Sequence, residues 1–189
     1  MTTSTRDPLP GVLPIFYQRW SPRAFTPSPV NADALARIMD AARWSPSCFN
    51  DQPWRFYTST DETFDQYLNL LNEKNRSWAK DASVIGFLIG CKTFRHNNQP
   101  NSSFALDCGA AWMAMSLQAN AEGLHTHGLA GIDRQGVAEY LNLDTDTYAV
   151  LMGFVIGEQG SPDQLDDDMR SKEAPNGRLA LDTIWRTAR

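Results

Sequence analysis

The chain has 189 residues and a formal net charge of -5, with 42% hydrophobic and 21% charged residues. This length fits one domain, since domains commonly hold about 100–200 residues, and the composition is that of an ordinary globular protein. The acidic balance disfavours a general nucleic-acid surface, which would require a clustered basic face.

The N-terminal residues have the composition of a loose segment. Residues 1–14 contain four Thr or Ser residues and three prolines, so we expect a flexible arm there, followed by a single domain over residues 15–189. The start lacks the charged region and continuous apolar core of a signal peptide. No apolar run approaches the roughly 20 residues that a membrane-spanning helix needs. We therefore expect a cytoplasmic protein without membrane contact.

The segment RWSPRAF, residues 19–25, places Arg19 and Arg23 four residues apart around a Ser-Pro step. One interpretation is a solvated turn. The other is a binding site for an anion, because guanidinium groups form charge-assisted hydrogen bonds to anions and the Ser21 hydroxyl adds a donor. The segment by itself leaves both interpretations open.

The first strong helix is predicted over residues 31–44, with Asn31 as its N-cap. Pro46 ends the helix, because proline lacks an amide hydrogen and restricts the residue before it. The apolar residues recur at the spacing of one buried helix face: Leu35, Ile38, Met39 and Ala42.

Residues 45–56, SPSCFNDQPWRF, admit two interpretations. They are either a polar connection between a helix and a strand, with Asn50 as a turn residue, or a polar lip over a planar heteroaromatic ligand. Amide side chains suit the second role because they both donate to and accept from a ring edge.

The next elements are predicted from periodicity. Residues 54–60 alternate and are β-prone, which indicates a strand, and residues 61–73 indicate a weaker amphipathic helix. Residues 82–91, and a second run within residues 148–160, are short and rich in Val, Ile and Phe. Such runs are typical of fully buried strands.

The longest helix is predicted over residues 103–123, closed by Gly123 in a C-cap position. A helix that is apolar on most faces must be buried on most faces, and a single sheet covers only one side. We therefore expect a subunit interface on the other. The apolar residues lie on two sides of this helix: Phe104, Cys108, Ala111 and Met115 on one, and Trp112, Met113 and Leu117 on the other.

The cysteines and histidines give no metal or disulfide pattern. Cys48, Cys91 and Cys108 form no CxxC pair, so we expect reduced, mostly buried thiols. His125 and His127 share a face only in an extended segment, and no neighbouring ligands complete a metal site. We therefore predict no metal-binding residues.

The tail begins with three aspartates, residues 166–168, which we expect to be solvated, and continues through NGRLAL to a short final segment. The predicted order is helix, strand, helix, strand, long helix and strand. This order lacks a clean βαβα alternation, so it predicts an α+β fold with helices flanking a central sheet.

Four segments, in order, resemble the nitroreductase family of FMN-dependent oxidoreductases: RWSPRAF, PSCFNDQPWRF, DCGAAWMAMSLQANAEGL and GLAGID. The resemblance runs from about residue 19 to residue 178. Each motif is weak alone, whereas the ordered set at family-like spacing is specific. The resemblance implies a central, mostly antiparallel sheet flanked by helices, and an intertwined homodimer with FMN sites at the subunit interface.

The resemblance also implies roles for residues. Arg19, Ser21 and Arg178 correspond to groups that bind the FMN phosphate, which suits a dianion because guanidinium groups form bidentate, charge-assisted bonds. Trp20 lies between the first two and is included in the predicted site. Arg23 matches a cation at the pyrimidine edge, which favours the reduced, anionic flavin.

The other implied positions are four in the loop against the isoalloxazine ring, two in the loop whose backbone amide faces flavin N5, and one near the pyrimidine edge: Pro46, Ser47, Cys48 and Asn50; Ala130 and Gly131; and Asn75. Asn50 is expected to bond the ring edge. Cys48 stands where the family often has serine, and it is either a redox-sensitive group or a small filler. Asn176 stands where some members carry a second phosphate-binding lysine.

The predicted function is transfer of hydride from NAD(P)H through flavin N5 to nitroaromatic, quinone or similar electron-poor acceptors. No GxGxxG motif is present, so NAD(P)H is expected to stack transiently on the flavin, with ping-pong kinetics. No side chain is predicted to be catalytic, because solvent can supply protons to an open site. Two alternatives stay open: a flavin reductase that supplies a partner monooxygenase, and a flavin-binding dimer without turnover.

Overall fold

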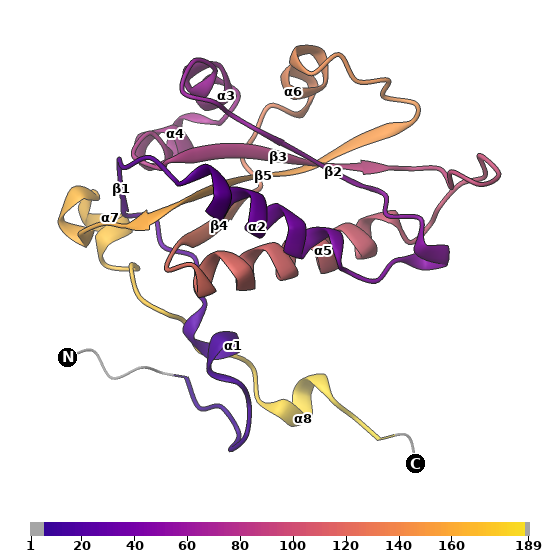
Figure 1. The fold of residues 1–189 in the computed structure, drawn as a ribbon. Helices are drawn as coiled ribbons and strands as arrows, with labels where there is room; N and C mark the ends of the chain where they lie inside the picture. The colour runs from indigo at the N-terminus through magenta and orange to yellow at the C-terminus, as the bar shows by residue number, and fades with distance from the viewer. Residues whose placement is uncertain (1–5, 188–189) are drawn as a thin grey trace.

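A computed structural model describes residues 6–187 and has a central sheet between two layers of helices (Figure 1). Every strand pairing is antiparallel; the strand order is β1-β5-β3-β2, and β4 also pairs with β5. This confirms the predicted α+β fold with a mostly antiparallel sheet. The strands are β1 (Phe25–Thr26), β2 (Trp54–Thr58), β3 (Val84–Cys91), β4 (His125–Leu129) and β5 (Tyr148–Gln159).

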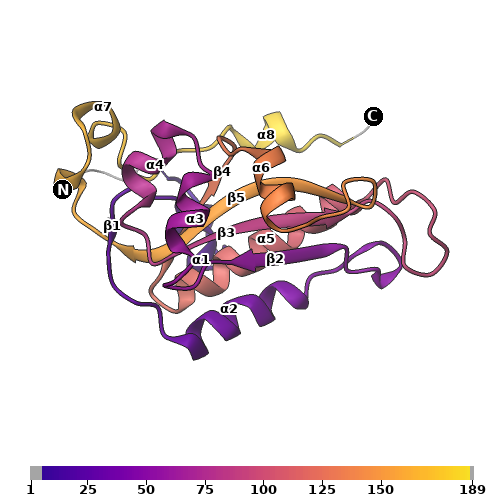
Figure 2. The same cartoon turned by 90° about the horizontal axis from the view of Figure 1, so that it is seen from above.

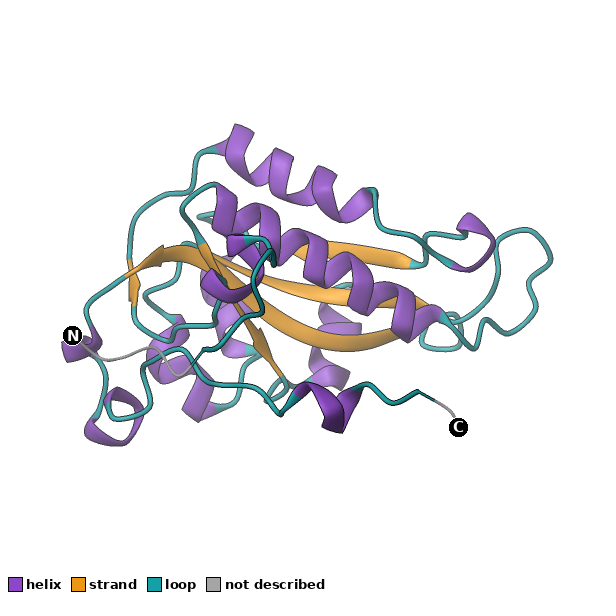
Figure 3. Ribbon diagram, turned by 90° about the horizontal axis from the view of Figure 1, so that it is seen from below, coloured by secondary structure: helices purple, strands orange, loops and turns teal. Residues whose placement is uncertain are grey.

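The helices divide between the two faces of the sheet. Helices α3, α4 and α6 lie on one face of the sheet, above it in Figure 1 and toward the viewer in Figure 2. Helices α2 and α5 lie side by side on the other face, toward the viewer in Figure 3. Short helices occur near both ends of the chain. The bounds are α1 (Pro14–Gln18), α2 (Ala32–Arg43), α3 (Phe64–Asn69), α4 (Glu73–Ala79), α5 (Phe104–Ala121), α6 (Arg134–Tyr140), α7 (Asp167–Arg170) and α8 (Leu181–Ile184).

Strand β3 lies between two hydrophobic cores, which explains its unbroken apolar sequence. All eight of its residues are buried. Ile85 and Phe87 belong to the core under α3 and α4, whereas Val84 and Leu88 belong to the core against α2 and α5. Side chains alternate across a strand, so a strand covered on both faces needs apolar residues at every position.

Helix α2 forms as predicted. The Asn31 side chain accepts hydrogen bonds from the amides of Asp33 (2.8 Å) and Ala34 (3.3 Å), which confirms the N-cap. Ile38 and Ala42 are fully buried against α5 and the sheet. The burial of this face fixes the C-terminal end of α2, from which residues 45–53 continue.

Helix α5 also forms as predicted, and Gly123 adopts the left-handed φ of 78° that a C-terminal glycine accommodates. Its sheet-facing residues, among them Cys108 and Met115, are fully buried. Its opposite face remains open: Leu106 is 78% exposed and Met113 37% exposed. The predicted second covering layer on this face stays a prediction.

Several elements differ from the prediction. Residues 61–73 form only α3, and a separate helix, α4, begins at Glu73 because the Asn72 side chain accepts from the Asn75 amide (2.9 Å) and caps it. Elements β4 and α6 carried no usable signal, since HTHGL has a single β-branched residue and α6 has only seven residues.

The predicted N-terminal arm is described from Arg6 onward, and residues 1–5 of that prediction lie outside the described residues. The division into an arm and one domain stays a prediction. None of the helices within residues 6–187 combines the length and the apolar character needed to cross a bilayer. Cys91 and Cys108 are buried and Cys48 is half-buried, and all three are free thiols, as expected.

Candidate functional site

Arg19 and Ser21 lie together directly after α1. Arg19 is the C-terminal cap of this five-residue helix and has extended backbone angles. Its Nη1 donates to the Ser21 hydroxyl at 3.3 Å, and its side chain is half-buried. Two of the predicted anion-binding groups therefore lie side by side, and the backbone here does not continue the helix.

Arg178 comes to the same place from the other end of the chain. Burial, and then the positive charges of Arg6 and Arg178, hold the pKa of Arg19 below its ordinary value of 12.5. The Arg178 guanidinium donates from Nη1 to the carbonyls of Gly177 (2.9 Å) and Asn176 (3.3 Å). These acceptors are neutral, so the bonds leave the positive charge in place. Arg6 was not among the predicted site residues, since no recognised motif covers the first residues.

Strand β4 contacts the segment that carries Arg19 through two histidine side chains. The His125 ring lies edge-on to Trp20, with centroids 6.4 Å apart. His127 Nδ1 bonds the Pro22 carbonyl at 2.8 Å, and its ring contacts Trp78 with centroids 4.8 Å apart. The two histidines share one face of an extended strand. They position the segment that carries Arg19.

Arg23 lies next to the part of β4 that follows His125, because His127 bonds the carbonyl of Pro22. Its backbone amide donates to Glu173 Oε1 at 2.6 Å, and the Ala24 amide donates to the same oxygen at 2.8 Å. The Glu173 carboxylate thus fixes the backbone of this segment to the C-terminal region. The pKa of His127 is lowered by burial, and to a smaller extent by the charges of Arg23 and Arg19. Arg23 thus directly follows a residue whose carbonyl is held to β4 by His127 Nδ1.

Asn75 and Gly131 are bonded to each other just beyond the end of β4. Asn75 Nδ2 donates to the Gly131 carbonyl at 3.0 Å, and the Asn72 amide donates to the same oxygen at 3.0 Å. A Cβ at Gly131 would lie 2.1 Å from Asn72 Nδ2 and 2.8 Å from Asn75 Nδ2. Because Gly131 has no side chain, the amide groups of Asn72 and Asn75 can lie this close to its backbone. Ala130 precedes it and is exposed.

The loop of residues 46–52 is held partly by two side chains that were not among the predicted site residues, those of Asp107 and Gln52. The Cys48 amide donates to Asp107 Oδ2 on α5 at 3.1 Å. The Gln52 amide donates to Ser47 Oγ at 3.0 Å, and Gln52 Nε2 donates to the carbonyl (2.9 Å) and the Oδ1 (3.1 Å) of Asn50. Pro46 is exposed at the start of the loop.

This loop is also strained. Phe49 and Asn50 both have φ of 54°, and Gln52 has φ of 52°. Left-handed angles are costly for residues other than glycine and persist only where surrounding contacts impose them. Phe49 is nevertheless 78% exposed, so its own burial does not impose the angle. The contacts of Cys48, Asn50 and Gln52 hold the loop in this form.

The loop lies at the opposite end of the sheet from the cations. The Pro53 carbonyl accepts from the Cys91 amide at 2.8 Å, which places the loop at the C-terminal end of β3. Val84, at the other end of β3, is level with Ile156, and Ile156 pairs with Thr126 beside His125. The eight residues of β3 span roughly 23 Å. In Figure 1 the start of β2 and strand β1 lie at opposite ends of the sheet.

The structure thus sorts the predicted site residues into groups. One group comprises Arg19, Trp20, Ser21 and Arg178, and Arg23 lies next to it. A second group comprises Asn75, Ala130 and Gly131. Within one chain, neither is brought together with the loop residues: Pro46, Ser47, Cys48 and Asn50.

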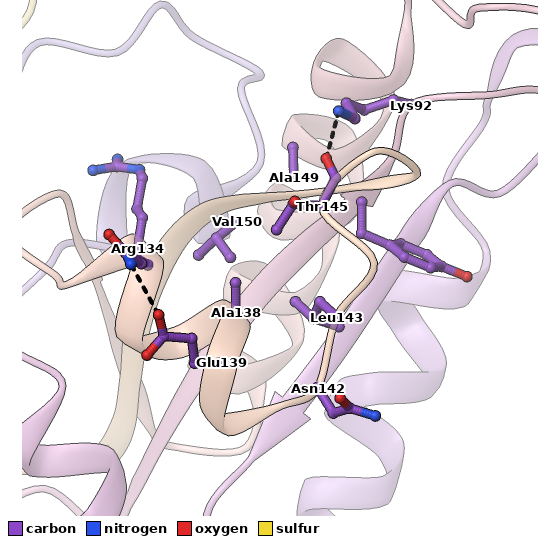
Figure 4. A pocket seen from close by; sticks show the side chains of 11 residues that line it. Lys92, Arg134, Ala138, Glu139, Asn142, Leu143, Thr145, Ala149 and Val150 are labelled. Atoms are coloured by element: carbon purple, nitrogen blue, oxygen red, sulfur yellow. Dashed lines mark hydrogen bonds between the residues drawn. The ribbon is translucent and has the colours of Figure 1, made fainter.

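A separate hollow between α6 and β5 contains none of the predicted site residues. It has a volume of about 750 Å³, and Lys92, Arg134 and Leu143 are among the residues that line it (Figure 4). Lys92 Nζ donates to the Thr145 carbonyl at 2.7 Å, and Arg134 Nη2 donates to the Leu151 carbonyl at 3.2 Å. Its cations thus hold neighbouring backbone, and nothing in its lining points to a ligand.

The sequence model of the nitroreductase family matches residues 16–86 and 70–158. The chain belongs to the nitroreductase family. This assignment confirms the resemblance drawn from the ordered motifs.

Similar proteins agree with this family. A crystal structure described as an oxidoreductase containing FMN is 37% identical, with a TM-score of 0.92, and the match covers 100% of this chain and 98% of that one. A nitroreductase family protein from Streptococcus pneumoniae TIGR4 shares the fold at 17% identity, with a TM-score of 0.73 and coverage of 92% and 98%. The Streptomyces coelicolor protein SCO7141, provisionally named an NADH dehydrogenase/NAD(P)H nitroreductase, is 26% identical over 76% of this chain and 80% of its own.

The two histidines of β4 predict a loss of stability in acid. Burial lowers the folded-state pKa of His125 and His127, whereas the ordinary value is 6.5. Below about pH 6.5 the unfolded chain therefore binds more protons than the folded chain, and the free energy of unfolding falls as the pH drops. Denaturant unfolding at about pH 7.5 and about pH 5.5 should show this loss, and a His125→Gln/His127→Gln variant should lose less. An equal loss of unfolding free energy in both proteins would show that these two histidines do not cause the acid destabilisation.

Proposed function

We propose that the protein is an FMN-dependent oxidoreductase that passes a hydride from NAD(P)H to a nitroaromatic, quinone or similarly electron-poor acceptor. The observation that carries this proposal is the convergence of Arg19, Ser21 and Arg178 from opposite ends of the chain. Two guanidinium groups and a hydroxyl at one place suit a phosphate monoester, because charge-assisted bonds satisfy its oxygens. Membership of the nitroreductase family and the FMN-containing structure at 37% identity support the same cofactor.

The order of groups along β4 supports an elongated ligand. The cations and Trp20 stand beside His125 at the start of the strand, Arg23 stands beside His127, and Gly131 follows the end of the strand. A ligand with an anionic group at one end and a polar-edged ring at the other matches this order. The amide of Asn75 and the exposed backbone at Ala130 then serve the ring.

The side chains hold the cofactor and tune it. Bound FMN would supply the ring that accepts and releases the hydride. Arg19, Ser21 and Arg178 would hold its phosphate. The cation of Arg23 would stabilise negative charge on the ring, which raises the driving force for accepting the hydride. Because Ala130 is exposed, solvent reaches this region and can supply protons. The nicotinamide donor and the acceptor would use the same face in turn, which gives ping-pong kinetics.

The loop with Pro46, Ser47, Cys48 and Asn50 would complete the site from a second copy of the chain. Within one chain this loop is at the far end of the sheet from the cations. The open face of α5 suits a copy of itself, since it is lined at helical spacing by small and apolar residues: Leu106, Gly109, Ala110, Met113, Ala114 and Leu117. A homodimer across this face would cover the helix and bring loop and cations together.

The terminal segments support the same dimer. Figures 1 and 3 show both ends of the described chain on the side of α5 that faces away from the sheet. They carry many large apolar side chains that one chain leaves exposed: Leu9, Val12, Leu13, Phe16, Leu179, Leu181, Ile184 and Trp185. Exposed apolar patches of this kind mark contact surfaces, and a second copy would bury them.

The proposed function predicts a yellow protein whose colour NAD(P)H bleaches. The purified protein, reconstituted with FMN, should show the absorption bands of bound flavin and should lose them under anaerobic addition of NADH or NADPH. A nitroaromatic or a quinone should then restore them. Protein that takes up no FMN would refute the proposal. Restoration by free flavin alone would indicate a flavin reductase, and a flavin that neither nucleotide bleaches would indicate a binding protein.

Arg19→Ala should weaken FMN binding. Removing one partner of a buried charge pair typically costs about 2–5 kcal/mol, so the dissociation constant should rise roughly 30-fold or more. Titration followed by flavin fluorescence measures this. Arg23→Ala should instead lower the reduction potential of bound FMN, with a smaller effect on affinity. Unchanged affinity in both variants would show that the RWSPRAF segment does not hold the cofactor.

Met113→Glu should disrupt the dimer and FMN binding together. Met113 lies on the open face of α5, where a buried carboxylate without a partner would oppose association. Analytical ultracentrifugation should show a monomer and spectroscopy should show little bound FMN. Ala36→Glu, on the exposed face of α2, is the matched control and should stay dimeric and yellow. A dimeric, flavin-loaded Met113→Glu protein would argue against this interface.

A further inference from the structure

Arg6, in the segment before α1, is bonded to both halves of the phosphate-binding group. Its Nη1 donates to the Arg19 carbonyl at 2.8 Å and also to the Tyr17 carbonyl. Its Nε donates to the Asn176 carbonyl at 3.1 Å. One side chain near the start of the chain therefore joins the backbone after α1 to the backbone before Arg178.

The bonds of Arg6 bring its charge next to the other two cations. The Asn176 carbonyl accepts from Arg6 Nε at 3.1 Å and from Arg178 Nη1 at 3.3 Å, so both guanidinium groups share one acceptor. Arg6 also donates to the backbone carbonyl of Arg19, and the side chain of Arg19 donates from Nη1 to Ser21 Oγ. Three guanidinium groups from three parts of the sequence thus surround one place.

The packing of the terminal segments keeps Arg6 there. The N-terminal and C-terminal segments face one another across a hollow of about 400 Å³ that Arg6 and Arg178 both line. Apolar side chains from the two segments complete it, among them Phe16 and Leu181. Arg6 is half-buried, which limits the ability of water to screen its charge from the neighbouring cations.

The proximity of these cations to one another is electrostatically unfavourable. Like charges in close proximity disfavour each other's charged form, and burial followed by the charge of Arg178 lowers the pKa of Arg6. The carbonyls that accept these bonds are neutral, so the bonds themselves do not cancel the repulsion between the guanidinium groups. A phosphate dianion would relieve the repulsion within the group of three.

We propose that Arg6 is a positioning residue for the phosphate end of the cofactor, which fastens the Arg19 and Arg178 segments together and adds a third positive charge to the site. The inference rests on the proposed binding of FMN. It assigns a binding role to the N-terminal segment, which no motif in the sequence indicates. The contribution of Arg6 should depend on the phosphate group and not on the flavin ring.

Paired titrations with FMN and riboflavin test this, because riboflavin lacks the phosphate. The flavin-free full-length protein and its Arg6→Gln variant are titrated with each ligand by fluorescence. Arg6→Gln should weaken FMN binding by about tenfold, the factor that one charge-assisted contact typically supplies, and should leave riboflavin binding unchanged. Arg6→Lys should retain part of the preference for FMN, since it keeps the charge. Arg43→Gln, which removes an exposed arginine paired with Asp40, should behave like the parent.

The outcomes separate the inference from the function on which it rests. If the parent protein binds no FMN, the proposed function fails and the inference fails with it. If the parent binds FMN but Arg6→Gln keeps the parental ratio of FMN to riboflavin affinity, the role of Arg6 is refuted while the function stands. Equal weakening of both ligands gives that same ratio and identifies Arg6 as a structural contact only. An Arg6→Lys variant no better than Arg6→Gln would refute the contribution of charge.

Discussion

The convergence of arginines from distant parts of the chain is the constraint around which the proposed site is built. Arg19 follows the first helix, Arg178 belongs to the tail, and Arg6 bonds the backbone of both regions. Holding like charges together opposes folding unless something compensates them. The fold therefore sets up, at the edge of the sheet, a place whose electrostatics favour an anion over water. In the proposed function, the phosphate of the cofactor supplies this compensation.

Strand β4 and the two ends of β3 organise everything else around that place. Through His125 and His127, β4 supports the segment that carries the cations, and it ends just before the Asn75–Gly131 contact. Strand β3 separates these groups from the strained loop at residues 46–52, which α5 holds through Asp107. One chain thus carries the two groups of proposed site residues at opposite ends of a sheet. Two copies facing each other across α5 would make both complete.

The main elements were predictable because burial leaves a periodic signal. The capped helix from Ala32, the apolar β3 and the apolar-all-round α5 follow directly from such patterns. Strand β4 was missed because its contacts, and not its residue types, make it a strand. Arg6, Glu173 and Asp107 were missed for a related reason: they act through single bonds between distant segments, and nothing in their local sequence marks them. The site residues came from the resemblance of the ordered motifs to a family.

In the proposed dimer, each site combines the cations of one chain with the loop of the other, and mixed dimers can separate these two contributions. Arg19→Ala impairs the cation side, and Cys48→Trp would block the loop side with a bulky ring. Each variant alone should bind little FMN. In a dimer that contains one copy of each, one site carries both defects and the other carries neither. Such mixed dimers should regain one tightly bound FMN per dimer, measured as bound flavin absorbance. Mixed dimers that bind no more FMN than either variant alone would contradict this shared site, because a site built within one chain would remain defective in both copies.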